Sequence, residues 1–414
     1  MRYPRRLNGR IESALADTPV LLIHGPRQSG KSTLAQAVAA RHGHRYLTLD
    51  DAAQLAAATE DPIGFVDRLE RPCSTRSSGR RHSSCRSRPR SIARDPGRFI
   101  LTGSANLLCM PTLSDSLAGR IEVLRLEPLT QLEIEGEASG GTFVTRLFAR
   151  DEPASREPEP RLGDALARRV LAGGFPAALS RETHARRERW LREYVDALVE
   201  KDLRELFSLR RPDVIPLLLE AAAARTARLF NAADLASPFA LTRPTIAAYL
   251  HHLENVFLID RLPPWHSNRM SRLVKTPKLH VTDTGLASAV LGVDLDALLG
   301  ERELYGQLLE TSVYLELRRQ ANWEEVDYRF HHFRDKDGLE VDLVIERSGR
   351  SLCAVEVKAG ATVNASDFKA IKRLRDTHGT RFHRGIVLHD GERTLSFGDR
   401  LFAMPFHELW RANG

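Results

Sequence analysis

The chain has 414 residues, of which 42% are hydrophobic and 28% charged, so it is long enough for two or three domains with buried cores. Its formal net charge is +7, but residues 73–94 alone contribute seven Arg and no acidic residue, so the charge says little about partners. No apolar run approaches the roughly 18 residues of a membrane span, the N-terminus lacks the apolar core of a secretory signal, and the four Cys have neither zinc-ligand nor disulfide spacing. We therefore expect a cytoplasmic protein that does not associate with membranes.

Residues 19–43 form the most informative segment. The apolar run 20–24 precedes GPRQSGKS (25–32), which fits G-x-x-x-x-G-K-[ST], and a periodic helix follows. This order of strand, loop and helix is the context that identifies a phosphate-binding loop. We predict that ATP is bound by nine consecutive residues: Gly25, Pro26, Arg27, Gln28, Ser29, Gly30, Lys31, Ser32 and Thr33.

Each residue type in this loop has a physical reason. Gly25 and Gly30 permit backbone angles that a side chain would forbid, so that N–H groups turn inward around phosphate oxygens. The helix that begins near Lys31 adds its positive N-terminal end. The Lys31 ammonium can reach the β- and γ-phosphates, the Ser32 hydroxyl can ligate Mg²⁺, and Thr33 supports the start of the helix.

The next strand is predicted at 45–51 and ends in Asp50 and Asp51. These carboxylates either orient Mg²⁺ or water, or they cap the following helix, and the cap is the favoured interpretation because Asp is a preferred N-cap residue. A further strand, 98–106, would place Thr102, Ser104 and Asn106 at its carboxyl end, where α/β sheets bind ligands.

Residues 119–129, GRIEVLRLEPL, contain the next predicted strand, and Arg120 stands just before its apolar part. Arg120 could contact a γ-phosphate, or it could be a solvated residue at the start of the strand. The sequence leaves these two interpretations open.

A P-loop ATPase also needs a second acidic strand, in which an Asp holds Mg²⁺ through water and a neighbouring Glu polarises the attacking water. That strand should lie between Asp51 and Phe99. Its place is taken by residues 73–94, CSTRSSGRRHSSCRSRPRSIAR, which hold seven Arg, seven Ser and no carboxylate. We therefore expect nucleotide binding to survive, hydrolysis to be badly impaired, and the parallel sheet to lose a central strand.

Several segments resemble the bacterial and archaeal AAA+-type ATPases that carry an uncharacterised C-terminal domain. In the N-terminal part these segments are GPRQSGKSTL, FILTGSANLL and LSDSLAGRIEVLRLEPLTQLEI; further along they are GGFPAAL, YVDALVEKDL and KTPKLHVTDTGLASAVLG. The resemblance covers nearly the whole chain outside residues 73–94. It implies that the missing segment is similar to VLDEVQRAP followed by a helix.

The anomalous segment can be read as a frameshift. With permitted codons for residues 73–89, one base borrowed from the codon of Pro72 and two from that of Arg90, a frame displaced by one gives VLDEVQRAPALLLPVKAS, which is absent from this chain. The hypothesis is that two compensating frame changes lie near residues 72 and 90. The alternative is an Arg- and Ser-rich disordered loop that binds nucleic acid. The coding DNA distinguishes them.

The middle of the chain is predicted to be helical. Residues 186–206 form an amphipathic helix whose apolar stripe belongs to a core. Residues 229–265 have helix-turn-helix character, with helices at about 232–236 and 243–254 and strands after them, as in a winged helix. The second helix carries few basic residues, so a structural or protein-contact role is favoured over DNA contact.

The C-terminal part contains a nuclease-like constellation. A helix at 306–320 carries Glu310, a strand at 338–346 carries Asp342, and a strand at 352–360 carries Glu356 and Lys358 on one face. This pattern resembles the PD-(D/E)xK nucleases. The resemblance implies that Asp342 and Glu356 ligate Mg²⁺, that Lys358 activates the attacking water, and that Glu310 assists at the metal. The alternative is a degenerate nuclease fold that was kept for interaction.

The predicted fold class is α/β, with a P-loop parallel sheet, a helical and winged-helix region, and a restriction-endonuclease-like domain. The expected divisions are a P-loop domain, a connector, a helical region and a nuclease-like domain, at 1–135, 136–185, 186–295 and 296–414. The predicted function is an ATP-binding AAA+-like protein coupled to a nuclease-like domain that acts on DNA. The alternatives are a nucleotide-dependent regulator or scaffold without cleavage, and a damaged family member. Oligomers are common among AAA+ relatives, but no residue here indicates a subunit contact.

Overall fold

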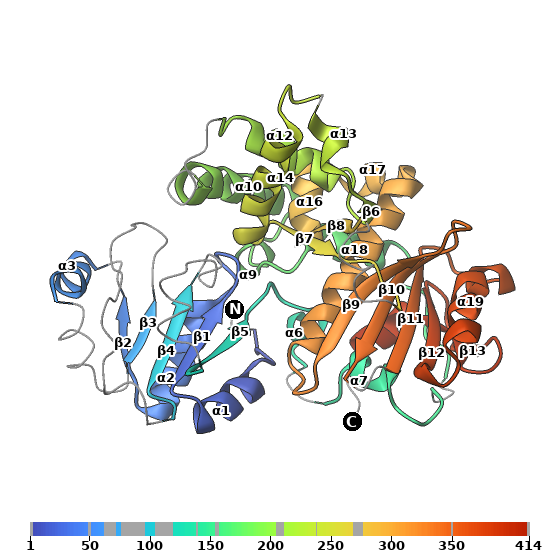
Figure 1. Cartoon of the computed structure of the whole chain (residues 1–414), viewed down its shortest axis with the longest axis horizontal. Helices are drawn as coiled ribbons and strands as arrows, with labels where there is room; N and C mark the ends of the chain where they lie inside the picture. Colours follow the sequence, from blue (N-terminus) through green and yellow to red (C-terminus); the bar gives the residue numbers. More distant parts are fainter. Residues whose placement is uncertain are drawn as a thin grey trace.

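The computed structural model describes residues 3–48, 51–61, 72–75, 96–103, 119–137, 140–153, 157–203, 211–236, 238–267, 276–348 and 351–411. The elements form a mixed α/β structure with three sheets (Figure 1). In Figure 1 the N-terminal parallel sheet lies beside a larger C-terminal sheet, and a group of helices with a small third sheet lies above both. Within this described part, no helix combines the length and the apolar character needed to cross a bilayer.

The N-terminal sheet has five strands in the order β2-β3-β4-β1-β5, and all its pairs are parallel. Its strands are β1 (Val20–His24), β2 (Arg45–Thr48), β3 (Pro72–Thr75), β4 (Phe99–Gly103) and β5 (Ile121–Arg125). Helices α1 (Asn8–Asp17), α2 (Lys31–His42) and α3 (Ala52–Glu60) accompany it. The strands predicted near 20–24, 45–51, 98–106 and 119–129 are therefore confirmed, with shorter bounds for the last three.

The expected loss of a central strand was wrong. β3 pairs with β2 and β4, and Cys73 stands opposite both Tyr46 and Ile100. The physical reason is that parallel pairing uses backbone N–H and C=O groups, which almost any sequence supplies. The anomalous segment thus fills the position of the missing strand without supplying the missing carboxylates. Residues 76–95 lie outside the described part of the chain.

The helical part of the chain runs through a series of mostly short helices. They are α6 (Gln131–Ile134), α7 (Phe143–Leu147), α8 (Asp164–Ala172), α9 (Pro176–Leu179), α10 (His184–Ala197), α12 (Val214–Ala223), α13 (Ala232–Ala236), α14 (Arg243–Asn255), α16 (Thr284–Leu291) and α17 (Leu295–Gly300). The helix predicted at 186–206 is α10, continued by the π-helix η2 (Leu198–Leu203). Its stripe is core, as predicted, because Tyr194, Leu198 and Leu203 are buried.

The predicted helix-turn-helix segment contains the expected elements. Thr242 caps α14 by accepting a hydrogen bond from the Thr245 N–H. The strands β6 (Arg228–Leu229), β7 (Ile259–Leu262) and β8 (Lys278–Val281) form an antiparallel sheet in the order β6-β8-β7. Assignment of this unit to the winged-helix class stays a prediction.

The C-terminal sheet has six strands in the order β13-β14-β12-β11-β10-β9. They are β9 (Tyr328–Arg334), β10 (Glu340–Arg347), β11 (Ser351–Lys358), β12 (Phe382–His389), β13 (Leu395–Ser396) and β14 (Leu401–Pro405). Pairing is antiparallel from β9 to β11 and parallel from β11 through β12 to β14. The order of parallel and antiparallel pairs makes this sheet mixed rather than doubly wound.

Helices cover both faces of the C-terminal sheet. The helix α18 (Arg302–Ala321) packs on the face that carries Val355, and α19 (Lys369–His378) packs on the face that carries Ala354. Side chains of period 2 on β10 and β11 therefore enter two different cores. One core joins residues 143 to 410, so the predicted connector packs into it, whereas the P-loop sheet has a separate core from Leu7 to Leu126.

Candidate functional site

The predicted phosphate loop lies between β1 and α2, as the motif requires. Gly25 has a φ of +145° and Gly30 has a φ of +93°, both in the region that favours glycine. A Cβ on Gly25 would lie 2.1 Å from the carbonyl oxygen of Leu126, so this glycine also permits close backbone approach between β1 and β5. Gly30 is the N-cap of α2, so that helix points its N-terminus at the loop.

Lys31 sits inside the loop that it is predicted to serve. Its ammonium donates to the carbonyl oxygens of Gly25 at 3.0 Å and Pro26 at 2.6 Å, and the residue is buried. The next two residues, Ser32 and Thr33, are exposed on the first turn of α2. The loop backbone thus holds the lysine ammonium in place, while the Ser32 side chain is exposed.

The loop is in contact with elements far along the chain. The Tyr194 hydroxyl on α10 donates to the Arg27 carbonyl at 3.2 Å. His24, the last residue of β1, packs edge-on against Phe257 with 5.5 Å between ring centroids. Burial and the positive charge of Arg125 lower the pKa of His24 to about 4, so this imidazole is neutral at pH 7.

The other polar residues predicted near this site have mixed outcomes. Asp51 is the N-cap of α3 and accepts from the Ala53 and Gln54 N–H groups, so the favoured cap interpretation is confirmed. Asp50, Ser104 and Asn106 lie outside the described residues, and Thr102 is buried in β4. The role of Arg120 toward a γ-phosphate stays a prediction.

An ionic junction that the sequence analysis missed joins the P-loop sheet to the C-terminal part. Arg318 of α18 pairs with Glu127, which follows β5, and with Asp260 of β7. Arg125 adds a second cation 3.3 Å from Glu127, and Tyr314 donates to Asp260 at 2.8 Å. Burial alone would raise the pKa of Glu127, but Arg318 and Arg125 outweigh it and hold the pKa at about 2.

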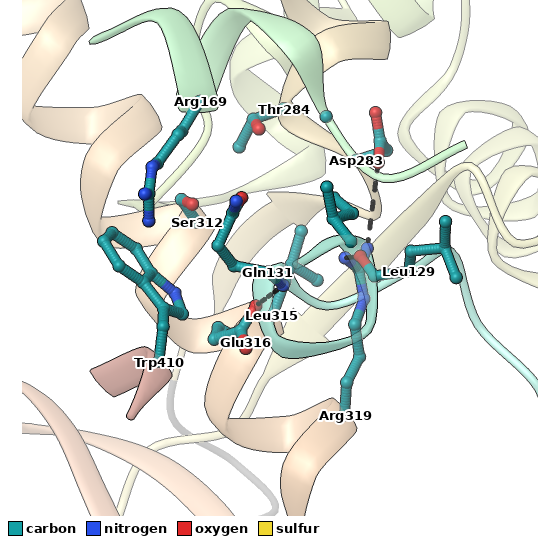
Figure 2. A pocket seen from close by; sticks show the side chains of 12 residues that line it. Leu129, Gln131, Arg169, Asp283, Thr284, Ser312, Leu315, Glu316, Arg319 and Trp410 are labelled. Atoms are coloured by element: carbon teal, nitrogen blue, oxygen red, sulfur yellow. Dashed lines mark hydrogen bonds and ion pairs between the residues drawn. The ribbon is translucent and has the colours of Figure 1, made fainter. Parts of the chain in front are cut away.

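A small cavity of about 30 Å³ lies where α6 meets α8, α16 and α18 (Figure 2). Asp283 accepts from the Gly174 N–H at 2.7 Å, and Glu316 accepts from the Gln131 N–H at 3.1 Å. Burial raises the pKa of Glu316 to about 7. The cavity has room for about one water molecule, so we assign it a structural role.

The structure brings the four predicted nuclease-like residues together. Asp342 on β10 accepts from the Val357 N–H at 2.9 Å, and its own N–H donates to Glu356 at 3.4 Å. Lys358 donates to Glu356 at 2.9 Å. Glu310 on α18 reaches the same cluster through a shared cation. Period-2 alternation on β11 placed Glu356 and Lys358 on one face, and the ion pair between them agrees with that prediction.

The shared cation is Lys278, which the sequence analysis did not select. Its ammonium lies 2.7 Å from Glu310, 2.7 Å from Glu340 and 3.5 Å from Asp342. Its side chain is only 3% exposed. Lys278 begins the apolar strand β8, and a lysine at such a position indicates that carboxylates are buried near it. The sequence could not identify these carboxylates because they lie on other elements. These contacts define the C-terminal charge cluster: Lys278, Glu310, Glu340, Asp342, Glu356 and Lys358.

Burial dominates the titration of this cluster. It raises the pKa of Glu310 well above the usual range and that of Glu356 to about 8, and in both cases the nearby Asp342 adds to the effect. Burial would lower the pKa of Lys278, but Glu310, Asp342 and Glu340 raise it overall. Within the described ranges, no group of three or more His, Cys, Asp or Glu side chains is arranged as metal ligands. The metal roles predicted for Asp342 and Glu356, and the catalytic roles of the cluster, stay predictions.

Comparisons with known proteins give families without an assigned function. Residues 163–297 match the model of a domain of unknown function (DUF8612), and residues 305–409 match that of a second domain of unknown function (DUF4143). The uncharacterized protein Rv2008c of Mycobacterium tuberculosis is 26% identical over 416 residues, which cover 97% of this chain and 83% of the relative. The uncharacterized protein MJ1544 of Methanocaldococcus jannaschii is 24% identical over 324 residues, which cover 76% of this chain and 68% of the relative.

Among solved structures, the chain is similar to the Walker-type ATPase PABY2304 of Pyrococcus abyssi. The TM-score is 0.39 and the sequence identity 16%, over 69% of this chain and 95% of that chain. A likeness at this level carries no argument about fold or function. The case for a nucleotide site therefore depends on the geometry of residues 25–33.

Proposed function

We propose that this chain binds ATP with Mg²⁺ at residues 25–33 and holds the nucleotide without turning it over. The observation that carries the proposal is the loop itself: two glycines in conformations of positive φ flank a lysine whose ammonium already lies among the loop carbonyls. Phosphate oxygens compete well for such an ammonium, because they add charge to the same hydrogen bonds. The Ser32 hydroxyl would ligate the Mg²⁺ ion that accompanies ATP.

Slow or absent hydrolysis follows from the strand next to β4. In a P-loop ATPase that strand supplies an Asp for Mg²⁺ and a carboxylate for water. Here the position is filled by β3, Pro72–Thr75, and the sequence from 72 to 94 contains no carboxylate. Bound ATP would therefore keep its γ-phosphate, so the chain would act as a nucleotide-dependent regulator or scaffold.

Nucleotide binding at residues 25–33 could affect the rest of the molecule through two contacts. Tyr194 contacts the loop backbone at Arg27, and Phe257 contacts His24 at the end of β1. Tyr194 belongs to the core that includes α10, α14 and the C-terminal sheet, and Phe257 is buried two residues after the end of α14. If bound phosphate orders residues 25–33, it would favour one arrangement of the contacts that Tyr194 and Phe257 make with this region.

Nucleotide binding is tested by calorimetric titration of the full chain with Mg-ATP. We expect binding by the wild type and none by Lys31→Ala. The control is Lys369→Ala, which removes an exposed lysine from α19 and should bind as the wild type does. Equal affinity of the wild type and Lys31→Ala would contradict the assignment of the loop.

Nuclease action by Glu310, Asp342, Glu356 and Lys358, with DNA as the substrate, is a second candidate; the convergence of these four side chains in one cluster favours it, whereas the Lys278 ammonium in the same cluster opposes it. Mg²⁺-dependent nicking of plasmid DNA that is lost in Asp342→Asn would establish it. Oligomer formation also stays a prediction.

A further inference from the structure

The C-terminal charge cluster already contains a cation in the position that a metal ion would need. The Lys278 ammonium lies within 3.5 Å of three carboxylates that come from two elements, Glu310 on α18 and Glu340 and Asp342 on β10. The remaining carboxylate, Glu356, pairs with Lys358. Each of the four carboxylates in the cluster therefore has an ammonium partner.

Lys278 is fixed in place by its backbone. It is the first residue of β8 and stands opposite Leu262 of β7 and Leu229 of β6, so strands hold it on both sides. Its side chain is 3% exposed, and an ammonium that left these carboxylates would have to cross a buried region. The β6-β8-β7 sheet therefore keeps the Lys278 ammonium within the C-terminal charge cluster.

An ammonium and a divalent cation compete for the same oxygens. Mg²⁺ requires near-octahedral oxygen ligands at about 2.1 Å and keeps several waters, which needs space between the carboxylates. Here Glu310 and Glu340 close on the nitrogen at 2.7 Å each, the normal distance for a charge-assisted hydrogen bond. The residues present do not fit the metal that the nuclease resemblance implies.

We propose that Lys278 is the resident cation of this cluster and that the native site binds no divalent metal. The cluster serves instead as an ionic contact that fixes the β6-β8-β7 sheet to the C-terminal sheet. A metal-activated water is then not available from these residues. The C-terminal part would act through its surface and its contact with the P-loop sheet. This inference is independent of ATP binding at residues 25–33.

The test is a titration of the full-length chain with Mn²⁺, without nucleotide, followed by the paramagnetic resonance signal of free Mn²⁺. We expect no site in the wild type or in Lys369→Met, the control on exposed α19. We expect Lys278→Met to gain one Mn²⁺ per chain, bound on the order of 100-fold more tightly than any nonspecific Mn²⁺ on the wild type, because a positive charge within a few ångströms has been removed. The gained site should disappear in the double variant Lys278→Met with Asp342→Asn.

A wild-type chain that binds one Mn²⁺, and loses it in Asp342→Asn, would overturn the proposal. A folded Lys278→Met chain that binds no Mn²⁺ would overturn it as well, because the lysine would then not stand in for a cation. If Lys278→Met does not fold, Lys278→Gln replaces it, and the wild-type titration decides in any case. Thermal melting gives a second readout: Mn²⁺ should raise the midpoint of Lys278→Met and leave that of the wild type unchanged.

Discussion

Arg318 on α18 forms a buried ion pair with Glu127, the second residue after β5, and so links the P-loop sheet directly to the C-terminal part of the chain. Arg318 also pairs with Asp260 of β7. One guanidinium therefore holds three units that are far apart in the sequence. Removal of one member of a buried pair leaves the other without compensation, which is costly.

Glu127 gives a pH-dependent prediction. The folded-state pKa is about 2, below its ordinary value of 4.5, so the unfolded chain binds a proton first as pH falls. The stability that this pair contributes, about 3 kcal/mol by the size of the shift, is present above pH 4.5 and is lost as pH falls toward 2. Urea unfolding of the wild type and Glu127→Gln at pH 7, 4.5 and 3 measures it.

In that experiment Glu127→Gln should be less stable than the wild type at pH 7, and the difference should shrink at pH 3. Glu122→Gln is the control, because its pair with Arg10 is partly exposed and should contribute little. A difference between wild type and Glu127→Gln that is the same at both pH values would contradict the role of this ion pair.

Gly25→Ala should abolish nucleotide binding and lower stability. The new Cβ would lie 2.1 Å from the Leu126 carbonyl oxygen, and the φ of +145° is unfavourable for alanine. Such backbone strain costs on the order of 1–3 kcal/mol. The comparison is Gly9→Ala in α1, where a Cβ meets nothing within 4 Å and alanine favours the helix. Chemical denaturation and ATP titration of both variants check this; a Gly25→Ala chain that binds ATP normally would refute the geometry.

Tyr194→Phe should weaken ATP binding because the hydroxyl that holds the Arg27 carbonyl is lost while the ring remains packed. The matched variant is Tyr314→Phe, which loses a hydroxyl bonded to Asp260 at a site away from the loop. Both changes should cost about 1 kcal/mol of stability, the usual size for one hydrogen bond. Only Tyr194→Phe should reduce the affinity for ATP, and equal affinities in the two variants would show that α10 does not support the loop.

Sequence was sufficient to predict the strand, loop and helix of residues 20–42 because their geometry is local. Gly25, Gly30 and Lys31 lie within seven consecutive residues, and their spacing alone fixes their relation to one strand and one helix. The cap at Asp51 was predictable for the same reason. Alternation along β11 likewise placed Glu356 beside Lys358 without knowledge of the fold.

Long-range features were not predictable in this way. Lys278 meets Glu310 across 32 residues and Asp342 across 64, and only the packing of two sheets brings them together. The junction of Glu127 with Arg318 spans 191 residues. The β3 strand was missed for a different reason: its residue types, Pro-Cys-Ser-Thr, do not predict a buried strand, whereas the backbone makes the pairing with β2 and β4.

The nucleotide that the protein retains is the most direct test of ATP binding without hydrolysis. The full chain is incubated with Mg-ATP, separated from free nucleotide and extracted, and the retained nucleotide is identified by chromatography, with Lys31→Ala treated in parallel. Residues 25–33 with a carboxylate-free β3 predict one intact ATP per wild-type chain and none on Lys31→Ala. Retained ADP would show that hydrolysis occurs, and a wild-type chain that retains no nucleotide would show that the loop does not grip phosphate.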